Sequence, residues 1–293
     1  MKYYFSERRI LLNSVKDIKK HAKTLLYADW VSHIAVLFGF MVCILGLSFA
    51  GYASLALLNK YAHLTEVHYG LLSAFFTLFI GLPVIPLMYG FCVYAANTVY
   101  GHKPNILDLF YAFGSLRAFS RTYKLFFALV WRAIVVFAIP AACVYQAEVL
   151  LYEENFLFVS YYGYEVGYFV ISVGLFLLFY AAFAVFTRYA AAVYLTVENE
   201  LLPVSVCFSA ASFALSCHNG SHSYTRLMLS FLPLTVLSVF TFGVLFLVYT
   251  APLMLITCFL NAKTLTESSM LGLYFNVLFE KCHFPRPNTP LNL

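Results

Sequence analysis

The chain has 293 residues, of which 62% are hydrophobic and only 11% are charged, and its formal net charge is +5. A soluble globular protein carries about 25% charged residues and about half apolar ones, so this composition excludes an ordinary water-soluble enzyme or binding domain. In lipid, each backbone polar group needs a partner inside its own segment, which a helix provides. We therefore expect an all-α, polytopic transmembrane helix bundle of about six spans, with amphipathic helices at the interface.

Residues 1–28 are predicted to form a basic amphipathic helix in the cytoplasm. Ser6 can cap its first turn, and apolar residues then recur at helical spacing, with lysines and arginines on the other faces. These apolar positions are Leu11, Val15, Ile18, Ala22 and Leu25. The helix is suited to lie on an anionic inner leaflet or to pack on the cytoplasmic end of the bundle, and the two roles are compatible.

Residues 29–266 are predicted to form the membrane domain. A helix needs about 20 apolar residues to cross about 30 Å of hydrocarbon. Six runs meet this length or approach it: Ile34–Leu58, Leu71–Val99, Leu125–Tyr145, Tyr164–Thr187, Leu227–Val248 and Ala251–Thr266. Only Tyr249 and Thr250 separate the last two runs, and the sixth is short.

Two further segments are predicted to be short helices on the cytoplasmic side, Pro104–Ser120 after the second span and Pro203–Cys217 after the fourth. Pro104 suits a first helical turn because its fixed φ fits the helix and no N–H is needed there. An apolar stripe follows it at helical spacing. Its members are Ile106, Leu107, Phe110 and Phe113.

The cations predict the orientation, because Lys and Arg accumulate in cytoplasmic loops. They gather in the lead segment, in the segments after the second and fourth spans, and in residues 263–293; the opposite side holds one cation, Lys60, and five glutamates. We therefore expect a multi-pass protein of the cell (plasma) membrane with both termini in the cytoplasm. Residues 267–293 would be a cytoplasmic tail.

One frame, PLMxxxCxxxAxT, is written twice, over Pro86–Thr98 and Pro252–Thr264. Pro83 and Pro86 lie close together in the second span, where each removes a backbone donor and is expected to break or kink the helix. Transporters place binding sites at such interruptions, which makes Pro83, Pro86 and Pro252 candidate substrate or lipid contacts. The alternative is a kink that helps the helices to pack.

Arg132 is the charged residue that stands out within the predicted third span. A charge inside the membrane indicates function by default. Its long side chain can also reach the inner headgroups, so we expect a structural or lipid-headgroup role ahead of a substrate role.

Residue patterns that carry chemistry were not found. The sequence has no HExxH, no GxxxxGK[ST] and no paired carboxylates within the predicted spans, and its seven cysteines include no CxxC. We expect no enzymatic activity, no cofactor and no metal site.

Two stretches resemble an uncharacterised family of six-span bacterial integral membrane proteins, and more distantly the membrane domain of glycerophosphodiester phosphodiesterases. The first runs from Gly81-Leu-Pro83 through Gly90 to the segment 101–113, and the second covers Arg188–Ser212 and Tyr249–Pro252. The resemblance implies a six-helix bundle and assigns no activity, since the chain contains no phosphodiesterase catalytic domain.

The leading functional hypothesis is a non-catalytic scaffold or partner-binding protein of the cell envelope. The alternative is a small transporter or lipid-handling protein. The expected partners are membrane lipids of the anionic inner leaflet and a protein partner or second copy of the chain, but not nucleic acid.

Overall fold

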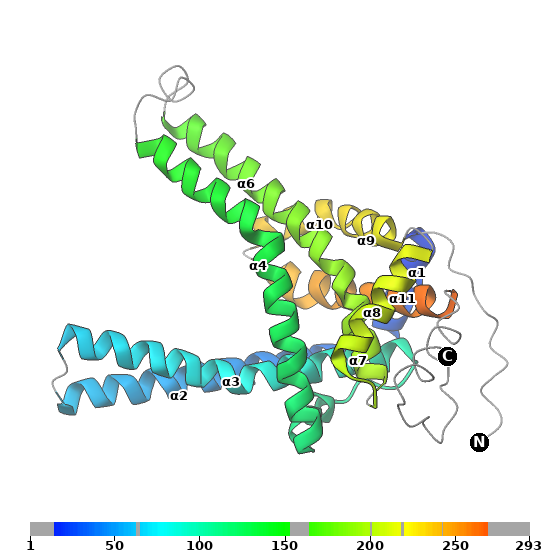
Figure 1. Cartoon of the computed structure of the whole chain (residues 1–293), viewed down its shortest axis with the longest axis horizontal. Coiled ribbons are helices and arrows are strands. Elements are labelled where there is room, and N and C mark those ends of the chain that lie inside the picture. The colour runs from blue at the N-terminus through cyan, green and yellow to red at the C-terminus, as the bar shows by residue number, and fades with distance from the viewer. Residues whose placement is uncertain are drawn as a thin grey trace.

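The computed structural model describes residues 15–62, 65–152, 164–199, 201–217, 220–241 and 243–268. Every regular element in these ranges is a helix, which confirms the all-α expectation (Figure 1). In chain order the elements are α1 (Val15–Ala28), α2 (Trp30–Ala62), α3 (Glu66–Val99), η1 (Ile106–Phe113), α4 (Leu116–Tyr152), α6 (Tyr164–Phe186), η2 (Thr187–Tyr189), α7 (Ala190–Glu198), α8 (Val204–Cys217), α9 (Gly220–Leu229), α10 (Leu232–Phe240), η3 (Phe246–Thr250) and α11 (Ala251–Ser268).

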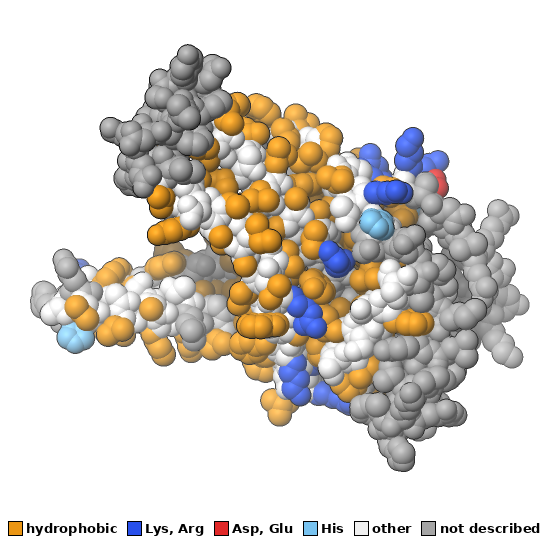
Figure 2. All heavy atoms as spheres, turned by 45° about the horizontal axis from the view of Figure 1, so that its top comes forward, with side chains coloured by type: hydrophobic (Ala, Val, Ile, Leu, Met, Phe, Trp, Pro, Cys, Tyr) orange, Lys and Arg blue, Asp and Glu red, His pale blue; other side chains and the backbone are white. Residues whose placement is uncertain are grey.

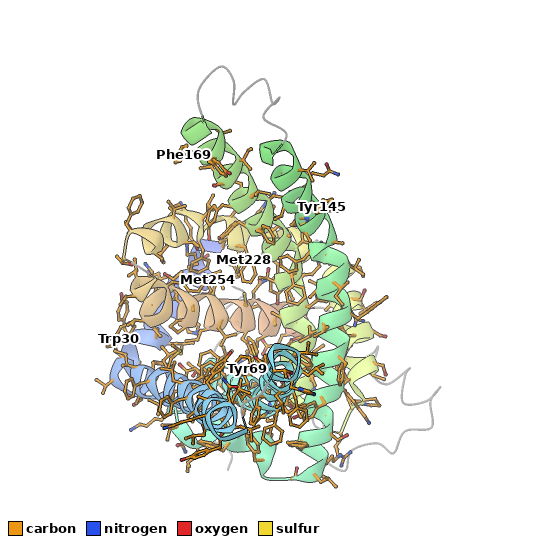
Figure 3. The ribbon with its side chains drawn as sticks, turned by 90° about the vertical axis from the view of Figure 1, so that its left-hand side faces the viewer. Trp30, Tyr69, Tyr145, Phe169, Met228 and Met254 are labelled. Atoms are coloured by element: carbon orange, nitrogen blue, oxygen red, sulfur yellow. The ribbon has the colours of Figure 1, made fainter. Side chains whose placement is uncertain are left out.

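Two long helical hairpins project from the rest of the molecule and diverge (Figure 1). The first arm is α2 with the outer half of α3, and the second arm is α4 with α6. In Figure 3, Tyr69 marks the outer part of the first arm, well apart from Phe169 on the second. Between 6% and 17% of the residues in the most apolar stretch of each arm helix are buried, against 67% in α11. The arms therefore present their apolar side chains outward, as helices solvated by lipid do.

The inner core lies where the arms meet and is formed by the inner half of α3 with α7, α8, α9 and α11 (Figure 1). Both copies of the PLMxxxCxxxAxT frame belong to it, one on α3 and one on α11. These helices lie side by side with their carboxyl ends together, since Lys263 Nζ sits 4.4 Å from the centre of the Tyr100 ring. Cys and Ala four residues apart give each frame a face of small side chains, which lets helices approach closely in a membrane.

The segment after α3 folds back onto it as η1. The Asn105 side chain accepts a hydrogen bond from Leu107 N and so caps the start of η1. Leu109 is buried, and a Cβ added to Gly90 of α3 would lie 2.1 Å from the Leu109 carbonyl oxygen. Only glycine permits this contact between the two backbones. The apolar stripe predicted for this segment stays exposed, because η1 buries Leu109 and Ala112 instead.

Five helices of the described residues are long and apolar enough to cross a membrane, one fewer than expected. The predicted fifth span, Leu227–Val248, is wrong as a single helix. It is divided into the end of α9, a break at Ser230 and Phe231, α10, and a turn in which Gly243 has a φ of +79°. Pro233, near the start of α10, lacks the N–H that a continuous helix would direct to Leu229.

The segments α9–α10 and α11 form an antiparallel hairpin (Figure 1). Near one end, Tyr224 OH donates to the Cys258 carbonyl oxygen at 3.2 Å, and near the other the hydroxyls of Ser238 and Thr250 are 3.4 Å apart. Figure 3 shows Met228 of α9 and Met254 of α11 close together inside the molecule. Of the two expected spans, the fifth is divided in this way, whereas α11 matches the sixth and is one of the five helices long and apolar enough to cross a membrane.

Other predicted boundaries shift because the helices are longer than the apolar runs. The helix that begins at Tyr164 continues through η2 into α7, so that 190–198, expected in a loop, is helical and largely buried. At 33 to 37 residues, α2, α3 and α4 are each about 50 Å long, well beyond the roughly 30 Å of hydrocarbon. Their inner parts build the core, and their outer parts form the arms.

The helix α1 packs on α11 and the end of α9, with Ile18, Ala22 and Leu26 buried. Packing on the bundle, one of its two predicted roles, is therefore observed, while Lys16, Lys20 and Lys23 remain exposed. Contact with an anionic leaflet stays a prediction. The predicted helix cap at Ser6 and the tail beyond residue 268 lie outside the described residues.

Candidate functional site

The helix α3 stays helical through Pro83 and Pro86, so the expected break is not found. Pro86 has no N–H to donate to the carbonyl oxygen of Leu82, four residues earlier. The Tyr123 hydroxyl, from α4, donates to that oxygen at 2.8 Å. The freed acceptor is thus satisfied by a neighbouring helix, as lipid requires. This favours the packing alternative for the two prolines.

Arg132 lies half-buried on α4 against aromatic rings. Its guanidinium carbon is 3.8 Å from the centre of the Phe208 ring and 5.6 Å from that of Tyr189. Its Nη1 donates to the carbonyl oxygen of Ala128 at 2.8 Å. Ring faces and a backbone carbonyl therefore compensate the charge. These contacts join α4 to α8 and η2, so Arg132 connects the second arm to the core.

Pro252 is buried near the start of α11, directly after the π-helical turn η3. The polar and ring contacts of Arg132 lie on α4, η2 and α8, so the structure does not bring Arg132 into one site with Pro252. The predicted candidate residues have separate packing roles.

Two grooves among the described residues lie elsewhere, along α1, α10 and η3. One has a volume of about 310 Å³ and is lined by Lys19, Lys23, Ser230, Phe231, Pro233, Leu234, Leu237, Tyr249 and Leu253. The next, of about 470 Å³, is lined by Tyr27, Trp30, Thr241, Val244, Leu245, Val248 and Tyr249. Tyr249 lines both, so together they make one track, which we call the α1–α10 groove.

Lys19 closes one end of the groove. Its Nζ donates to the carbonyl oxygen of Ser230 at 3.0 Å and to its Oγ at 3.2 Å, and lies 4.1 Å from the centre of the Phe231 ring. The Ser230 hydroxyl itself donates to the Leu227 carbonyl oxygen at 2.6 Å. Ser230 therefore fixes the lysine at the end of α9, where cations bind the last carbonyls of a helix.

The charged residues that line this end of the groove are both lysines. Burial, and then the nearby charge of Lys23, lower the pKa of Lys19 from its usual value. The residues lining the groove, all from the described part of the chain, include two lysines and no acidic side chain. An anion in the groove would compensate both charges.

Aromatic rings line one end of the groove, and aliphatic side chains line both of its parts. Tyr27, Trp30 and Tyr249 pack with ring centres 5.9 to 6.4 Å apart, and the two tyrosine hydroxyls are 3.4 Å from each other. Tyr and Trp favour the boundary between headgroups and hydrocarbon. Figure 3 shows Trp30 at the edge of the molecule, where the first arm begins. Of the aliphatic residues of the groove, Leu237 in the lysine part and Val244 in the aromatic part are exposed.

A second polar cluster ties the inner ends of three helices together. The Tyr100 hydroxyl donates to Glu198 Oε1 and lies 2.7 Å from the Tyr194 hydroxyl, and Lys263 covers the Tyr100 ring. Burial, and then the Glu198 carboxylate, raise the pKa of Tyr100 far above its usual value, which keeps it a donor. The cluster links α3, α7 and α11 and supports a structural role.

Sequence reasoning missed the α1–α10 groove because its residues come from segments more than 200 positions apart. Lys19 and Lys23 were included in the basic face of the lead helix, but nothing marked them as facing Phe231 or Leu237. The available signal was the pair of aromatic residues Tyr27 and Trp30 at the end of that basic helix, a pattern that is typical of a membrane boundary.

Comparisons with protein-family models, with curated proteins and with solved structures found no match.

Proposed function

We propose that the chain is a non-catalytic membrane protein that binds lipid laterally in the α1–α10 groove. The observation that carries this proposal is the composition of the groove: lysines at one end, aromatic rings at the other, and aliphatic side chains in both parts. A membrane lipid combines a polar headgroup, an interfacial region and an acyl chain in the same way. The two parts of the groove, with volumes of about 310 and 470 Å³, are also in the range of known ligand sites, about 300 to 1,000 Å³.

The transport version of this hypothesis needs a path beside Pro86 and Arg132. The two grooves described above follow α1, α10 and η3, and their lining supports lipid binding. We further propose the cell membrane as the location, with both chain ends in the cytoplasm. Support comes from the cations, which in Figure 2 gather on the side of the molecule away from the outer end of the first arm.

The test is native mass spectrometry of the protein purified in mild detergent, with the bound lipids identified. We expect discrete lipid adducts on the wild type and fewer on Leu237→Trp, which fills the groove from an exposed position. The matched control is Leu71→Trp, also exposed but on the first arm. Equal adducts on both variants, or none on the wild type, would contradict the proposal.

A second candidate function is partner binding, as a scaffold of the envelope. The observation that favours it is the divergence of the two arms, whose outward side chains include Phe79 and Phe169. Cross-linking from cysteines placed at these two positions, in native membranes, tests it. A single protein or a second copy of the chain trapped at both positions would favour the scaffold, and lipid-only surroundings would count against it.

A further inference from the structure

We infer that the α1–α10 groove selects an anionic phospholipid, with Lys19 and Lys23 receiving its phosphate and the α10 side of the groove receiving an acyl chain. This inference deepens the proposed function and rests on it. It concerns the chemical class of the lipid, which the shape of the groove alone does not determine.

The first step is the position of the charges. Lys19 Nζ is held by Ser230 and by the Phe231 ring, so its place is fixed before a ligand arrives. Lys23 stands one helical turn further along α1, on the same side, and also lines the groove. Two cations one turn apart on one helix face repel each other, and a phosphate between them removes this repulsion.

The second step is the chemistry of selection. A zwitterionic headgroup brings an ammonium together with its phosphate, and that ammonium needs an acidic or aromatic acceptor. The residues lining the lysine end include no carboxylate. Two aromatic residues line this end: the Phe231 ring is already covered by Lys19, and the Tyr249 ring packs with Tyr27 and Trp30. A headgroup that carries net negative charge therefore fits, and a zwitterionic one leaves its cation uncompensated beside two lysines.

The third step is the direction of the chain. From Lys19 the groove continues past Leu234 and Leu237 to Tyr249, and then to Val244 and Val248 beside Trp30. Aliphatic side chains therefore line the groove from the lysines to the aromatic residues Tyr249 and Trp30. An acyl chain that starts at the lysines contacts them along its length and passes the aromatic rings, which favour the interface.

The ligand in this proposal is a lipid of the inner leaflet, because a soluble anion would contact only the lysines and not the apolar side chains of the groove. The exposed aliphatic side chains Leu237, Val244 and Val248 would remain uncovered by phosphate alone. A diacyl phospholipid covers both ends at once.

The experiment is a competition in detergent, followed by native mass spectrometry, between phosphatidylglycerol and phosphatidylcholine with identical acyl chains. The full chain is compared with the double variant Lys19→Gln/Lys23→Gln. The matched control is Lys16→Gln/Lys20→Gln, which removes the same charge from exposed positions of α1 outside the groove. We expect the wild type to prefer phosphatidylglycerol by about tenfold, since each lysine near a lipid surface adds a several-fold preference. The groove variant loses this preference, and the control keeps it.

The outcomes separate the two proposals. If the groove variant still binds both lipids but without preference, both proposals hold. If the wild type binds both lipids equally, or if both double variants lose the preference alike, the inference of a specific anionic site fails while lipid binding stands. If no variant and no wild-type sample binds either lipid, the proposed function itself fails.

Two further measurements exclude other ligands in the groove. Inorganic phosphate that displaces the lipid completely would show a soluble-anion site and overturn the inference, as would a protein found bound in place of lipid. Each variant must elute like the wild type in size-exclusion chromatography. If Lys19→Gln/Lys23→Gln fails this check, Lys23→Gln alone replaces it, because Lys23 is exposed and has no role in fixing α9.

Discussion

The arm helices are more apolar than α11 of the inner core, and the two regions are held together in different ways. In the core, small side chains at Cys258 and Ala262 bring backbones together, and tyrosines such as Tyr224 hydrogen-bond to neighbouring helices. The arms expose large side chains such as Phe49 and Phe75. Because lipid tails are as apolar as these side chains, burial alone does not drive helices together in a membrane. Close packing and hydrogen bonds between helices distinguish the core from the arms.

The largest expected effect comes from adding a methyl group where two backbones touch. Gly90→Ala would place Cβ 2.1 Å from the Leu109 carbonyl oxygen, and neither backbone can move without disturbing η1. We expect the free energy of unfolding to fall by about 3 kcal/mol. Thermal unfolding of the protein in detergent measures the change.

The control for this variant is Gly174→Ala on the second arm, where no atom lies within 4 Å of the new methyl group. There the substitution removes the conformational freedom of glycine in a helix, so stability should be unchanged or higher by up to about 1 kcal/mol. Equal destabilisation by both variants would remove the distinction between core and arm.

An intermediate effect on stability is expected at Arg132, which connects the second arm to the core. Arg132→Ala removes the guanidinium stacked on Phe208, which we expect to cost about 1 to 2 kcal/mol of unfolding free energy. Lys124→Ala, at an exposed position of the same helix, should change it by less than about 0.5 kcal/mol. If Arg132→Ala left the unfolding midpoint unchanged, the contact with Phe208 would not be holding the arm.

The smallest expected effect concerns the carbonyl that Pro86 leaves without a donor. Tyr123→Phe deletes the hydroxyl that reaches the Leu82 oxygen and should lower stability by about 1 kcal/mol. In a Pro86→Ala background, alanine restores an N–H donor in the helix, so the same substitution should then cost less. A double-mutant cycle from unfolding curves measures this coupling. Tyr145→Phe, on the exposed outer part of α4, is the control and should be silent.

Much of the architecture follows from the sequence because the length of an apolar run is a physical requirement of the bilayer. This requirement predicted the all-α class and the four long helices of the arms. It did not predict the division of Leu227–Val248, because that run is long and largely apolar, although Pro233 and Gly243 lie at the two breaks. Hydropathy separates core from arm in part, since α11 is less apolar than the arm helices, but it does not show which helices pack together.

The candidate site was less accessible to sequence reasoning. The sequence identified Arg132 as a charge within a predicted span. It did not identify the rings that the guanidinium contacts, Phe208 and Tyr189, because they lie more than 50 positions further along the chain. The same holds for Lys19, whose partner Ser230 follows it by 211 positions. Contacts of this kind depend on how the helices cross, and helical periodicity within one segment carries no information about crossing.

The α10–α11 hairpin has a consequence for biogenesis. Its turn, at Thr241 and Leu245, lies beside Tyr27 and Trp30, where the first arm begins, rather than beside the arm tips. At nine residues, α10 is about 14 Å long and too short to cross the hydrocarbon alone, so we expect the hairpin to enter and leave on one face of the bilayer. Its turn then needs no passage through the membrane during synthesis. The hairpin itself would settle last, against helices already in place.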